Sequence, residues 1–445
     1  MRIHRAPLLA GALAIMVSIA APAAAETAAP ASTLPQGAIK HVLVIDLENE
    51  DYASSFGPFS PAKYLNNVLV PMGQLLTQYH AIGHASTDNY LAQVSGQAPN
   101  TVSGSDCVTN TTTFASTYTN VTPGTLDPDQ AKYPGQVDGN GCVYPSSVQT
   151  IGNQLDALTN GYTHGQPLTW RQYAEDMGNQ PARDFGPPDP MGGTDCAHPA
   201  TDGTFPNVAT ATDQYAIRHV PFLFFRSVTD DKAYCDKHVV PLGSFTTGPH
   251  GDTFSGHLAE DLAQAHTTPA FSFVTPNVCN DGHDATCVGF NAEGGHAGGL
   301  VGADLWLKHW MPLILNSPAY MSGQMLVVVT FDEASPFDTS ASNNEQPGPE
   351  DANPGMPPLI AKLFGYPYPA PAGTYPGGGR VGAVLLNAKW IQPGSVNDTP
   401  YNHYAALRSY EDLLGISTGG SDGKGHLGFA GAAGLRSFGS DVFGH

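Results

Sequence analysis

The stretch His41-Val42-Leu43-Val44-Ile45-Asp46-Leu47 is followed directly by Glu48-Asn49-Glu50-Asp51. A short apolar run rich in branched residues is typical of a strand that is buried on both faces of a parallel sheet. The acidic turn after it would lie at the carboxyl end of that strand, where open α/β sheets gather their ligands. We therefore expect a buried strand over residues 41–47 and a polar site that begins at Glu48.

Two other apolar runs also end in acidic or amide residues. Residues 325–331 end in Asp332-Glu333, and residues 270–274 lead into a turn at 277–284 that is rich in Asn and Asp. We expect further strands at 358–364 and 382–386, and helical segments at 64–80, 90–94, 148–157, 170–177, 303–316 and 403–414. Strands that alternate with helices predict an α/β fold with a doubly wound, mostly parallel sheet.

The middle of the chain has a different composition. Residues 97–214 are dense in Gly, Pro, Thr, Asn and Asp and carry three of the six cysteines. We expect one domain over residues 39–445, in which 97–214 form a loop-rich insertion tied by disulfides. Of the pairings that six cysteines allow, we favour the sequential one: Cys107–Cys142, Cys196–Cys235 and Cys279–Cys287.

The amino-terminal segment has the pattern of a secretory signal. Arg2 and Arg5 precede an apolar run at 7–20, and small residues lead up to Glu26. We expect a cleavable signal peptide over residues 1–25, a flexible leader over 26–38, and a secreted or periplasmic protein. Because no later stretch is long and apolar enough to cross a bilayer, we expect no transmembrane segment in the mature chain.

The charge balance is strongly acidic. The chain has 39 Asp and Glu against 18 Lys and Arg, which gives a net charge of −21, and loss of Arg2 and Arg5 with the signal would make it −23. Such a balance argues against nucleic acid as a partner.

Ser86 lies in the stretch Gly83-His84-Ala85-Ser86-Thr87-Asp88-Asn89-Tyr90, just before a predicted helix. A hydroxyl at a helix start either caps free backbone N–H groups or lies beside a site that favours anions, where it could attack phosphorus. Taken alone, this stretch leaves both roles open.

The strand ends carry the other half of a candidate site. Carboxylates that meet at one edge of a sheet repel one another unless cations neutralise them, so Glu48, Asp332 and Glu333 predict a divalent metal. Oxygen ligands fit Ca, Mg or Mn, and added His would favour Zn. Near the same edge, His283 and His403 would add nitrogen ligands or phosphate donors, whereas His84, His219, His296 and His309, taken singly, are expected to be structural or surface groups.

Together these segments resemble the phosphoesterase family of bacterial secreted acid phosphatases and non-specific phospholipases C, within the alkaline phosphatase superfamily. The likeness is carried by Glu48-Asn49, His84 to Tyr90, His219-Val220-Pro221, Pro276 to Asp284, Gly302-Ala303-Asp304, Thr330 to Glu333 and His403-Tyr404. It is strongest to acid phosphatases that act on phosphatidylinositol 3-phosphate. Phospholipase C members continue Asp-Glu with Gly-Gly and an Asp-His pair, whereas this chain has Ala334-Ser335-Pro336-Phe337-Asp338.

The resemblance implies a role for each matching residue. Ser86 would be the nucleophile that forms a phosphoserine, Asn89 would donate to a phosphate oxygen, and His84 would orient the turn of the nucleophile. Glu48, Asn49, Asp332 and Glu333 would bind a divalent metal. A second metal site or a phosphate site would be built by Asp281, His283, Asp284, Asp304 and His403. The family often has Pro where Ala85 and Asp88 stand here.

Three functions are compatible with these features. The first is a metal-dependent phosphomonoesterase whose substrate is a phosphate ester, which could be a lipid phosphate. The second is a phosphodiesterase of the phospholipase C type. The third is a secreted calcium-binding protein, which would leave the joint presence of Ser86 and Asn89 unexplained.

Overall fold

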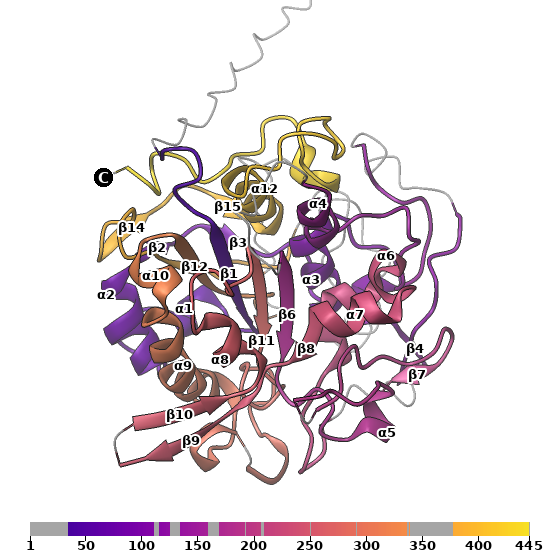
Figure 1. The fold of residues 1–445 in the computed structure, drawn as a ribbon, viewed down its shortest axis with the longest axis horizontal. Helices are drawn as coiled ribbons and strands as arrows, with labels where there is room; N and C mark the ends of the chain where they lie inside the picture. Colours follow the sequence, from indigo (N-terminus) through magenta and orange to yellow (C-terminus); the bar gives the residue numbers. More distant parts are fainter. Residues whose placement is uncertain are drawn as a thin grey trace, which may run out of the picture.

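A mixed sheet runs through the centre of the molecule (Figure 1), with its strands in the order β14-β2-β13-β12-β1-β11-β6-β8. The computed structural model describes residues 34–110, 115–124, 134–158, 169–191, 193–205, 209–249, 251–290, 292–335, 338 and 377–444. The sheet strands are β1 (His41–Leu47), β2 (Gln74–Leu76), β6 (Trp170–Ala174), β8 (Val239–Pro241), β11 (Phe271–Thr275), β12 (Met325–Phe331), β13 (Ala383–Leu386) and β14 (Ser395–Asn397).

The sheet is mostly parallel. β1 pairs in parallel with β11 on one side and β12 on the other, and β6 and β8 continue the parallel block beyond β11. β13 pairs antiparallel with both β12 and β2, so among these eight strands it alone runs against the others. Every residue of β1 and β12 is buried, as expected for strands covered on both faces. The predicted α/β class is confirmed.

Helices cover both faces of the sheet (Figure 1). On one face α3 (Ser86–Ser95) packs against α12 (His403–Leu413) and α4 (Ile151–Ala157). On the other face α9 (Gly299–Leu315) contacts α8 (His257–Leu262) and α10 (Pro318–Met321). This arrangement places the amino end of α3 at the carboxyl ends of the central strands.

Shorter elements complete the described part of the chain. The short helices are α1 (Tyr52–Ser55), a π-helical turn (Leu65–Leu69), α2 (Val70–Met72), α5 (Pro181–Asp184), α6 (Arg226–Thr229) and α7 (Lys232–His238). A hairpin of β9 (Ser244–Gly248) and β10 (Gly251–Ser255) lies beside α9, β3 (Tyr79–His80) pairs with β15 (Tyr401–Asn402), and β4 (Val108–Asn110), β5 (Ala115–Thr117) and β7 (Thr204–Phe205) form a small sheet.

The strongest sequence patterns are confirmed. β1 and β12 have the predicted bounds, β11, β13, α9 and α12 lie where a strand or helix was expected, and α3 ends at Gly96, which adopts a left-handed conformation. All three disulfides join the cysteines in the expected sequential pairs. The expected strand at 358–364 and the expected signal peptide lie outside the described residues.

Two helix predictions are wrong. Residues 64–80 are helical only to Met72, and β2 then begins at Gln74. Gly73 explains the change, because its backbone is extended and a Cβ there would lie 2.3 Å from the carbonyl oxygen of Leu385 in β13. The second wrong segment, 170–177, contains strand β6, which lies inside the main sheet between β11 and β8. Its buried Gln172 donates to Thr275 Oγ1 on β11 at 3.1 Å.

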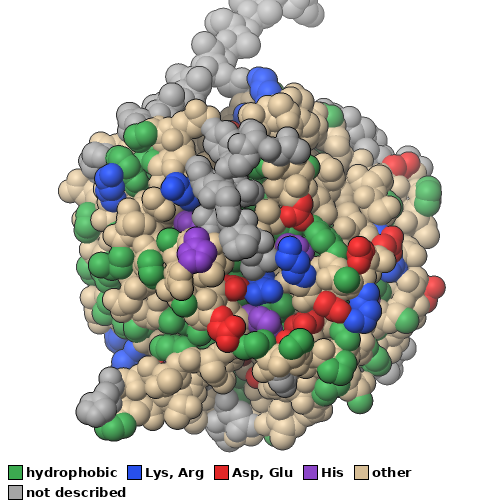
Figure 2. Space-filling model, viewed as in Figure 1, with side chains coloured by type: hydrophobic (Ala, Val, Ile, Leu, Met, Phe, Trp, Pro, Cys, Tyr) green, Lys and Arg blue, Asp and Glu red, His purple; other side chains and the backbone are tan. Residues whose placement is uncertain are grey.

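Figure 2 shows one face of the molecule, on which Lys and Arg side chains are interspersed with Asp and Glu. Within the described residues, no helix has both the length and the apolar character needed to cross a membrane.

Candidate active site

Three carboxylates meet at the carboxyl ends of the central strands. Glu48 directly follows β1, Asp332 directly follows β12, and Asp281 lies in the turn after β11. The backbone N–H of Glu48 donates to the carbonyl of Asp281 at 2.9 Å, and that of Asp332 donates to the carbonyl of Leu47 at 2.8 Å. All three acidic residues are fully buried. Parallel pairing therefore brings residues from distant parts of the chain to one edge of the sheet, as predicted.

Two backbone features let the acidic turns approach each other. Asn49 has a φ of 53°, a left-handed conformation that Asn tolerates, and its N–H donates to Asp332 Oδ1 at 3.0 Å. Gly282 has a φ of 115°, and a Cβ there would lie 2.7 Å from the carbonyl oxygen of Glu48. Asn49 thus reaches Asp332 through its backbone.

The hydroxyl of Ser86 points at the first of these carboxylates. Ser86 is the first residue of α3, is buried, and donates from Oγ to Glu48 Oε2 at 2.9 Å. Ala85 occupies the N-cap position with an extended backbone and has no side-chain group that could cap the helix. The hydroxyl at the helix start is therefore bound to a carboxylate and does not cap the helix.

The turn before Ser86 is held by Asn89. Its Oδ1 accepts from the N–H of Ile82 at 2.9 Å, and its Nδ2 donates to the carbonyls of Gly83 and Ala85 at 2.9 and 3.0 Å. His84 is buried beside Ala334, and burial lowers its pKa to about 4. Asn89 thus contacts the turn itself, and His84 lies next to it. The contact with phosphate that was expected of Asn89 stays a prediction.

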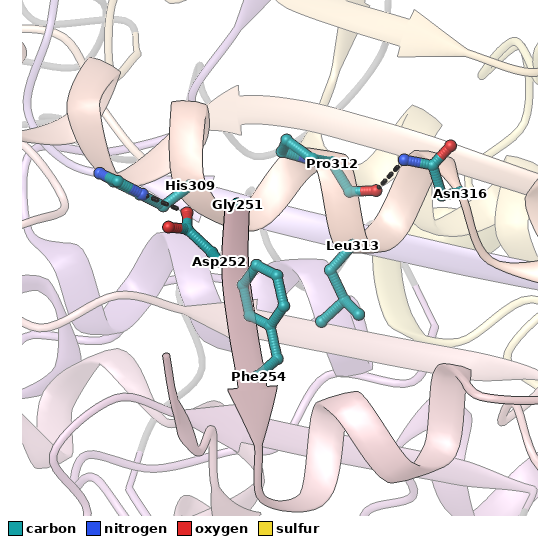
Figure 3. Close-up of a pocket in the computed structure, with 7 residues that line it drawn as sticks. All are labelled: Gly251, Asp252, Phe254, His309, Pro312, Leu313 and Asn316. Carbon is teal, nitrogen blue, oxygen red and sulfur yellow. Dashed lines mark hydrogen bonds and ion pairs between the residues drawn. The ribbon is translucent and has the colours of Figure 1, made fainter. Parts of the chain in front are cut away.

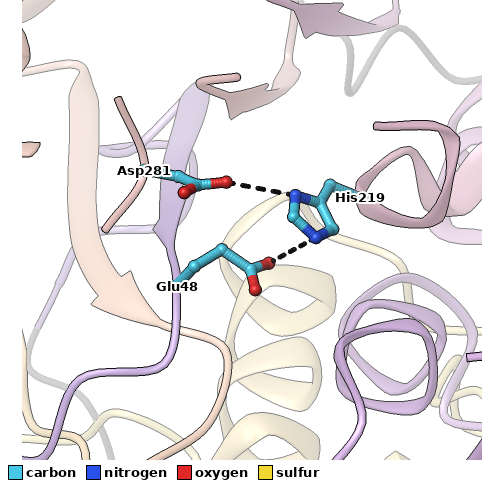
Figure 4. Close-up of side chains that lie close together, drawn as sticks. All are labelled: Glu48, His219 and Asp281. Atoms are coloured by element: carbon cyan, nitrogen blue, oxygen red, sulfur yellow. Dashed lines mark ion pairs between the residues drawn. The ribbon is translucent and has the colours of Figure 1, made fainter. Parts of the chain in front are cut away.

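His219 lies between Glu48 and Asp281 (Figure 4). Its Nε2 is 3.2 Å from Glu48 Oε1, and its Nδ1 is 3.2 Å from Asp281 Oδ2. The ring stacks on Tyr90 of α3, with centroids 5.3 Å apart and an interplanar angle of 11°. Taken singly, His219 was expected to be a structural or surface group, and only the segment His219-Val220-Pro221 in the family resemblance could have marked it.

Arg218 brings a positive charge to the same place. The residue is buried, and its charge lowers the pKa of both Glu48 and Asp281 against the larger effect of burial. It also donates from Nη2 to His283 Nε2 at 3.2 Å, while His283 Nδ1 lies 2.7 Å from Asp284 Oδ1. The His283 and Asp284 side chains are 30% and 28% exposed, so they form the more open side of the site.

Two of the predicted residues make contacts of a structural kind. His403 at the start of α12 donates from Nε2 to the carbonyl of Asp332 at 2.7 Å, and its Nδ1 lies 3.1 Å from the hydroxyl of Tyr79. Asp304 of α9 accepts from the N–H groups of Tyr64 and Leu65 at 2.9 and 2.8 Å. The first contact positions Asp332, and the second anchors the helical turn that begins at Leu65.

Burial, reinforced by repulsion between the carboxylates, dominates the electrostatics of the site. Burial raises the pKa of Glu48 well above its ordinary value, and the charges of Asp332 and Asp281 raise it further. Burial, followed by Glu333, raises the pKa of Asp332, and burial with Asp106 and Glu48 raises that of Glu333. The pKa of His219 is lowered by burial and by Arg218, so the imidazole is neutral. Buried carboxylates of this kind favour a bound cation.

The residues present fit a divalent metal ion. Glu48, His219 and Asp281 each offer one ligand atom, and these atoms lie within 4.8 Å of one another. Asp281 Oδ2 and both ring nitrogens of His219 have no hydrogen-bond partner of normal geometry within the described residues. Two carboxylates and one neutral imidazole are ligands that Zn²⁺ and Mn²⁺ accept.

A separate pocket of about 370 Å³ lies between β10 and α9 (Figure 3). Phe254, Pro312 and Leu313 supply its apolar lining, and His309 Nδ1 lies 2.5 Å from Asp252 Oδ2 at its rim. This pocket lacks a nucleophile paired with a base, and we assign no chemistry to it.

Comparison with known proteins identifies the family of this chain. Residues 65–417 match the sequence model of the Phosphoesterase family, which spans most of the chain, and the protein therefore belongs to that family.

Two relatives are named for a phosphatase activity. A phosphate-repressible acid phosphatase of Penicillium chrysogenum is 26% identical over 400 residues, covering 87% of this chain and 64% of that protein. A phosphatidylinositol-3-phosphatase of Mycobacterium tuberculosis is 26% identical over 416 residues, covering 93% of this chain and 90% of that protein. This chain spans less than two thirds of the length of the fungal acid phosphatases it matches, the shares being 64%, 52% and 57%.

Among solved structures, a protein of the alkaline phosphatase superfamily from Vibrio parahaemolyticus matches with a TM-score of 0.41 and 13% identity. That match covers 87% of this chain and 68% of the other.

Proposed function

We propose that this protein is an exported, metal-dependent phosphomonoesterase that acts through a phosphoserine at Ser86. The observation that carries the proposal is the 2.9 Å hydrogen bond from Ser86 Oγ to Glu48 Oε2, inside a buried group of carboxylates. A serine hydroxyl is a weak nucleophile unless a base or a metal activates it. Membership of the Phosphoesterase family supports attack on phosphorus.

The reaction would proceed in two displacements. Ser86 Oγ attacks phosphorus, the bond from phosphorus to the alcohol oxygen breaks, and the leaving alkoxide takes a proton from water. Glu48 Oε2 is the atom placed to accept the hydroxyl proton of Ser86. Water then attacks the phosphoserine, which releases inorganic phosphate and restores the hydroxyl.

Charge neutralisation would supply most of the rate, because the transition state of phosphoryl transfer is loose. Arg218 is the positive group next to Glu48 and Asp281, and His283 lies beside it on the more open side. A divalent cation held by Glu48, His219 and Asp281 would favour the alkoxide form of Ser86 and polarise a phosphoryl oxygen. Asp332 and Glu333 would add negative charge that favours the cation.

Substrate and location are proposed on separate grounds. The name of the Mycobacterium tuberculosis relative makes phosphatidylinositol 3-phosphate the first lipid substrate to test. The three disulfides fit an oxidising compartment and support export.

The experiment is hydrolysis of an aryl phosphate monoester and the matching diester by the purified protein, with divalent metals supplied. We expect a strong preference for the monoester. Preference for the diester would contradict the proposal and favour a phosphodiesterase of the phospholipase C type. No hydrolysis of either substrate would contradict enzymatic function and leave a calcium-binding role.

A further inference from the structure

A second group of metal-type ligands lies outside the candidate active site. Asp189 and Asp195 belong to the loop that follows α5, and His257 is the first residue of α8. The loop lies at the end of β8, because a Cβ on its Gly193 would be 2.7 Å from Pro241, the last residue of that strand. β8 is three strand spacings from β1, or about 14 Å, so this group is separate from Glu48.

The three side chains converge on one point. His257 Nε2 lies 2.8 Å from Asp189 Oδ2 and 3.9 Å from Asp195 Oδ1, and the three ligand atoms lie within 4.8 Å of one another. Ligand bonds to Zn²⁺ are about 2.0 to 2.2 Å, so the ligand atoms of a tetrahedral site lie roughly 3.3 to 3.6 Å apart. The distance from His257 Nε2 to Asp189 Oδ2 (2.8 Å) lies below that range, and the distance to Asp195 Oδ1 (3.9 Å) lies above it.

Asp195 gives an independent indication of a ligand. Its side chain is only 8% exposed, and its Oδ1 makes no hydrogen bond of normal geometry among the described residues, with His257 Nε2 3.9 Å away. A buried carboxylate oxygen without a partner is costly, and a bound cation would remove the cost.

The backbone around the group is already fixed. Asp189 Oδ1 accepts from the N–H of Met191 at 2.9 Å, and Asp189 donates its own N–H to the carbonyl of Gly193 at 2.7 Å. Next to Asp195, Cys196 forms a disulfide with Cys235 and donates its N–H to the carbonyl of Val239 in β8 at 2.8 Å. The ligands are thus held by short turns, a disulfide and a strand.

We propose that Asp189, Asp195 and His257 bind a second divalent cation of the zinc type, which joins this loop to α8 at the outer edge of the sheet. Two carboxylates and an imidazole suit zinc, whereas Ca²⁺ takes six to eight oxygen ligands. The site has three protein ligands and a fourth position open to water. The site is independent of the proposed phosphatase activity.

The first test is zinc binding to the full-length protein after chelation, measured as bound zinc per chain at equilibrium. We expect Asp195→Asn and His257→Gln each to bind one equivalent less than the wild type, or to bind that equivalent at least about 10-fold more weakly. The matched control is Asp202→Asn, which changes an exposed aspartate in the same part of the chain and should keep full binding. Equal binding by the wild type and both variants would overturn the proposal and leave only an ion pair between His257 and Asp189.

The second test needs no variant. Anomalous diffraction at the zinc edge from wild-type crystals soaked in zinc should give a peak between Asp189, Asp195 and His257. Its absence would overturn the proposal, whatever is found at Glu48. Because neither readout uses catalysis, failure of this site and failure of the phosphatase proposal are distinguishable.

Discussion

Ser86 and Glu48 are joined by a 2.9 Å hydrogen bond although 38 residues separate them in the sequence. The bond links the start of α3 to the end of β1, so the candidate nucleophile and the first candidate metal ligand lie where a helix start meets a strand end. This site also contains His219 and Arg218. It therefore combines groups that could activate the Ser86 hydroxyl with a positive charge that could neutralise an anion.

Chelation should inactivate the enzyme, because the buried carboxylates around Glu48 repel one another without a cation. We expect hydrolysis of an aryl phosphate monoester to fall at least 10-fold after exhaustive dialysis against a chelator, and to return when a divalent metal is restored. The rate is measured before dialysis, after dialysis and after each metal is added. Full activity in the metal-free protein would show that these carboxylates are structural.

His219→Gln should weaken metal binding at the active site, because the ring supplies the nitrogen between Glu48 and Asp281. We expect at least about 10-fold more metal to be needed for half-maximal activity. The measurement is activity as a function of free metal. His309→Gln is the control, since His309 also pairs with a carboxylate but lines the separate pocket. Identical metal curves for the wild type and His219→Gln would remove His219 from the site.

Asn89→Ala should destabilise the protein as well as lower its activity. The substitution leaves the N–H of Ile82 and the carbonyls of Gly83 and Ala85 without their side-chain partner. Each buried group left unpaired costs about 1–3 kcal/mol, so we expect the unfolding free energy to fall by about 2 kcal/mol or more. Urea unfolding measures the change. Unchanged stability together with lost activity would instead support a direct phosphate contact.

Glu411 should make stability depend on pH. This residue of α12 is fully buried, accepts from the N–H of Leu427 at 2.9 Å, and has a pKa that burial raises well above its ordinary value of 4.5. The folded protein therefore keeps a proton that the unfolded chain has lost, and the unfolding free energy falls as the pH rises above about 4.5 until the raised pKa is passed.

Glu411→Gln removes this titration. We expect its stability relative to the wild type to rise between about pH 4.5 and the raised pKa, by at most about 1.4 kcal/mol per pH unit. Urea unfolding at a series of pH values tests this, with the exposed Glu260→Gln as control. Parallel curves for the wild type and Glu411→Gln would contradict the account.

The central strands were predictable because their signal is local. β1 and β12 are runs of branched apolar residues, and the acidic residues that follow them lie at one edge of the sheet because parallel strands share a direction. β6 was not predictable in the same way. Its sequence, Trp-Arg-Gln-Tyr-Ala, has no β-branched residue, and its buried Gln172 donates to a partner on β11 that only the tertiary structure supplies.

His219 is the part of the candidate site that the sequence alone could not predict. It lies in a short 3-10 turn, Ile217–His219, far in sequence from both Glu48 and Asp281. No local pattern marks a histidine that the fold brings between two carboxylates. Placing it requires the tertiary structure or a family resemblance.

The most direct test of the account is kcat/KM of Ser86→Ala for an aryl phosphate monoester, with metal content and fold verified. Ser95→Ala, at the other end of α3, is the matched control and should keep its activity. We predict that kcat/KM of Ser86→Ala is at least about 1,000-fold lower than that of the wild type, a loss of about 4 kcal/mol of transition-state stabilisation. Retention of about one tenth of the wild-type value or more would contradict Ser86 as the nucleophile and direct attention to Thr87.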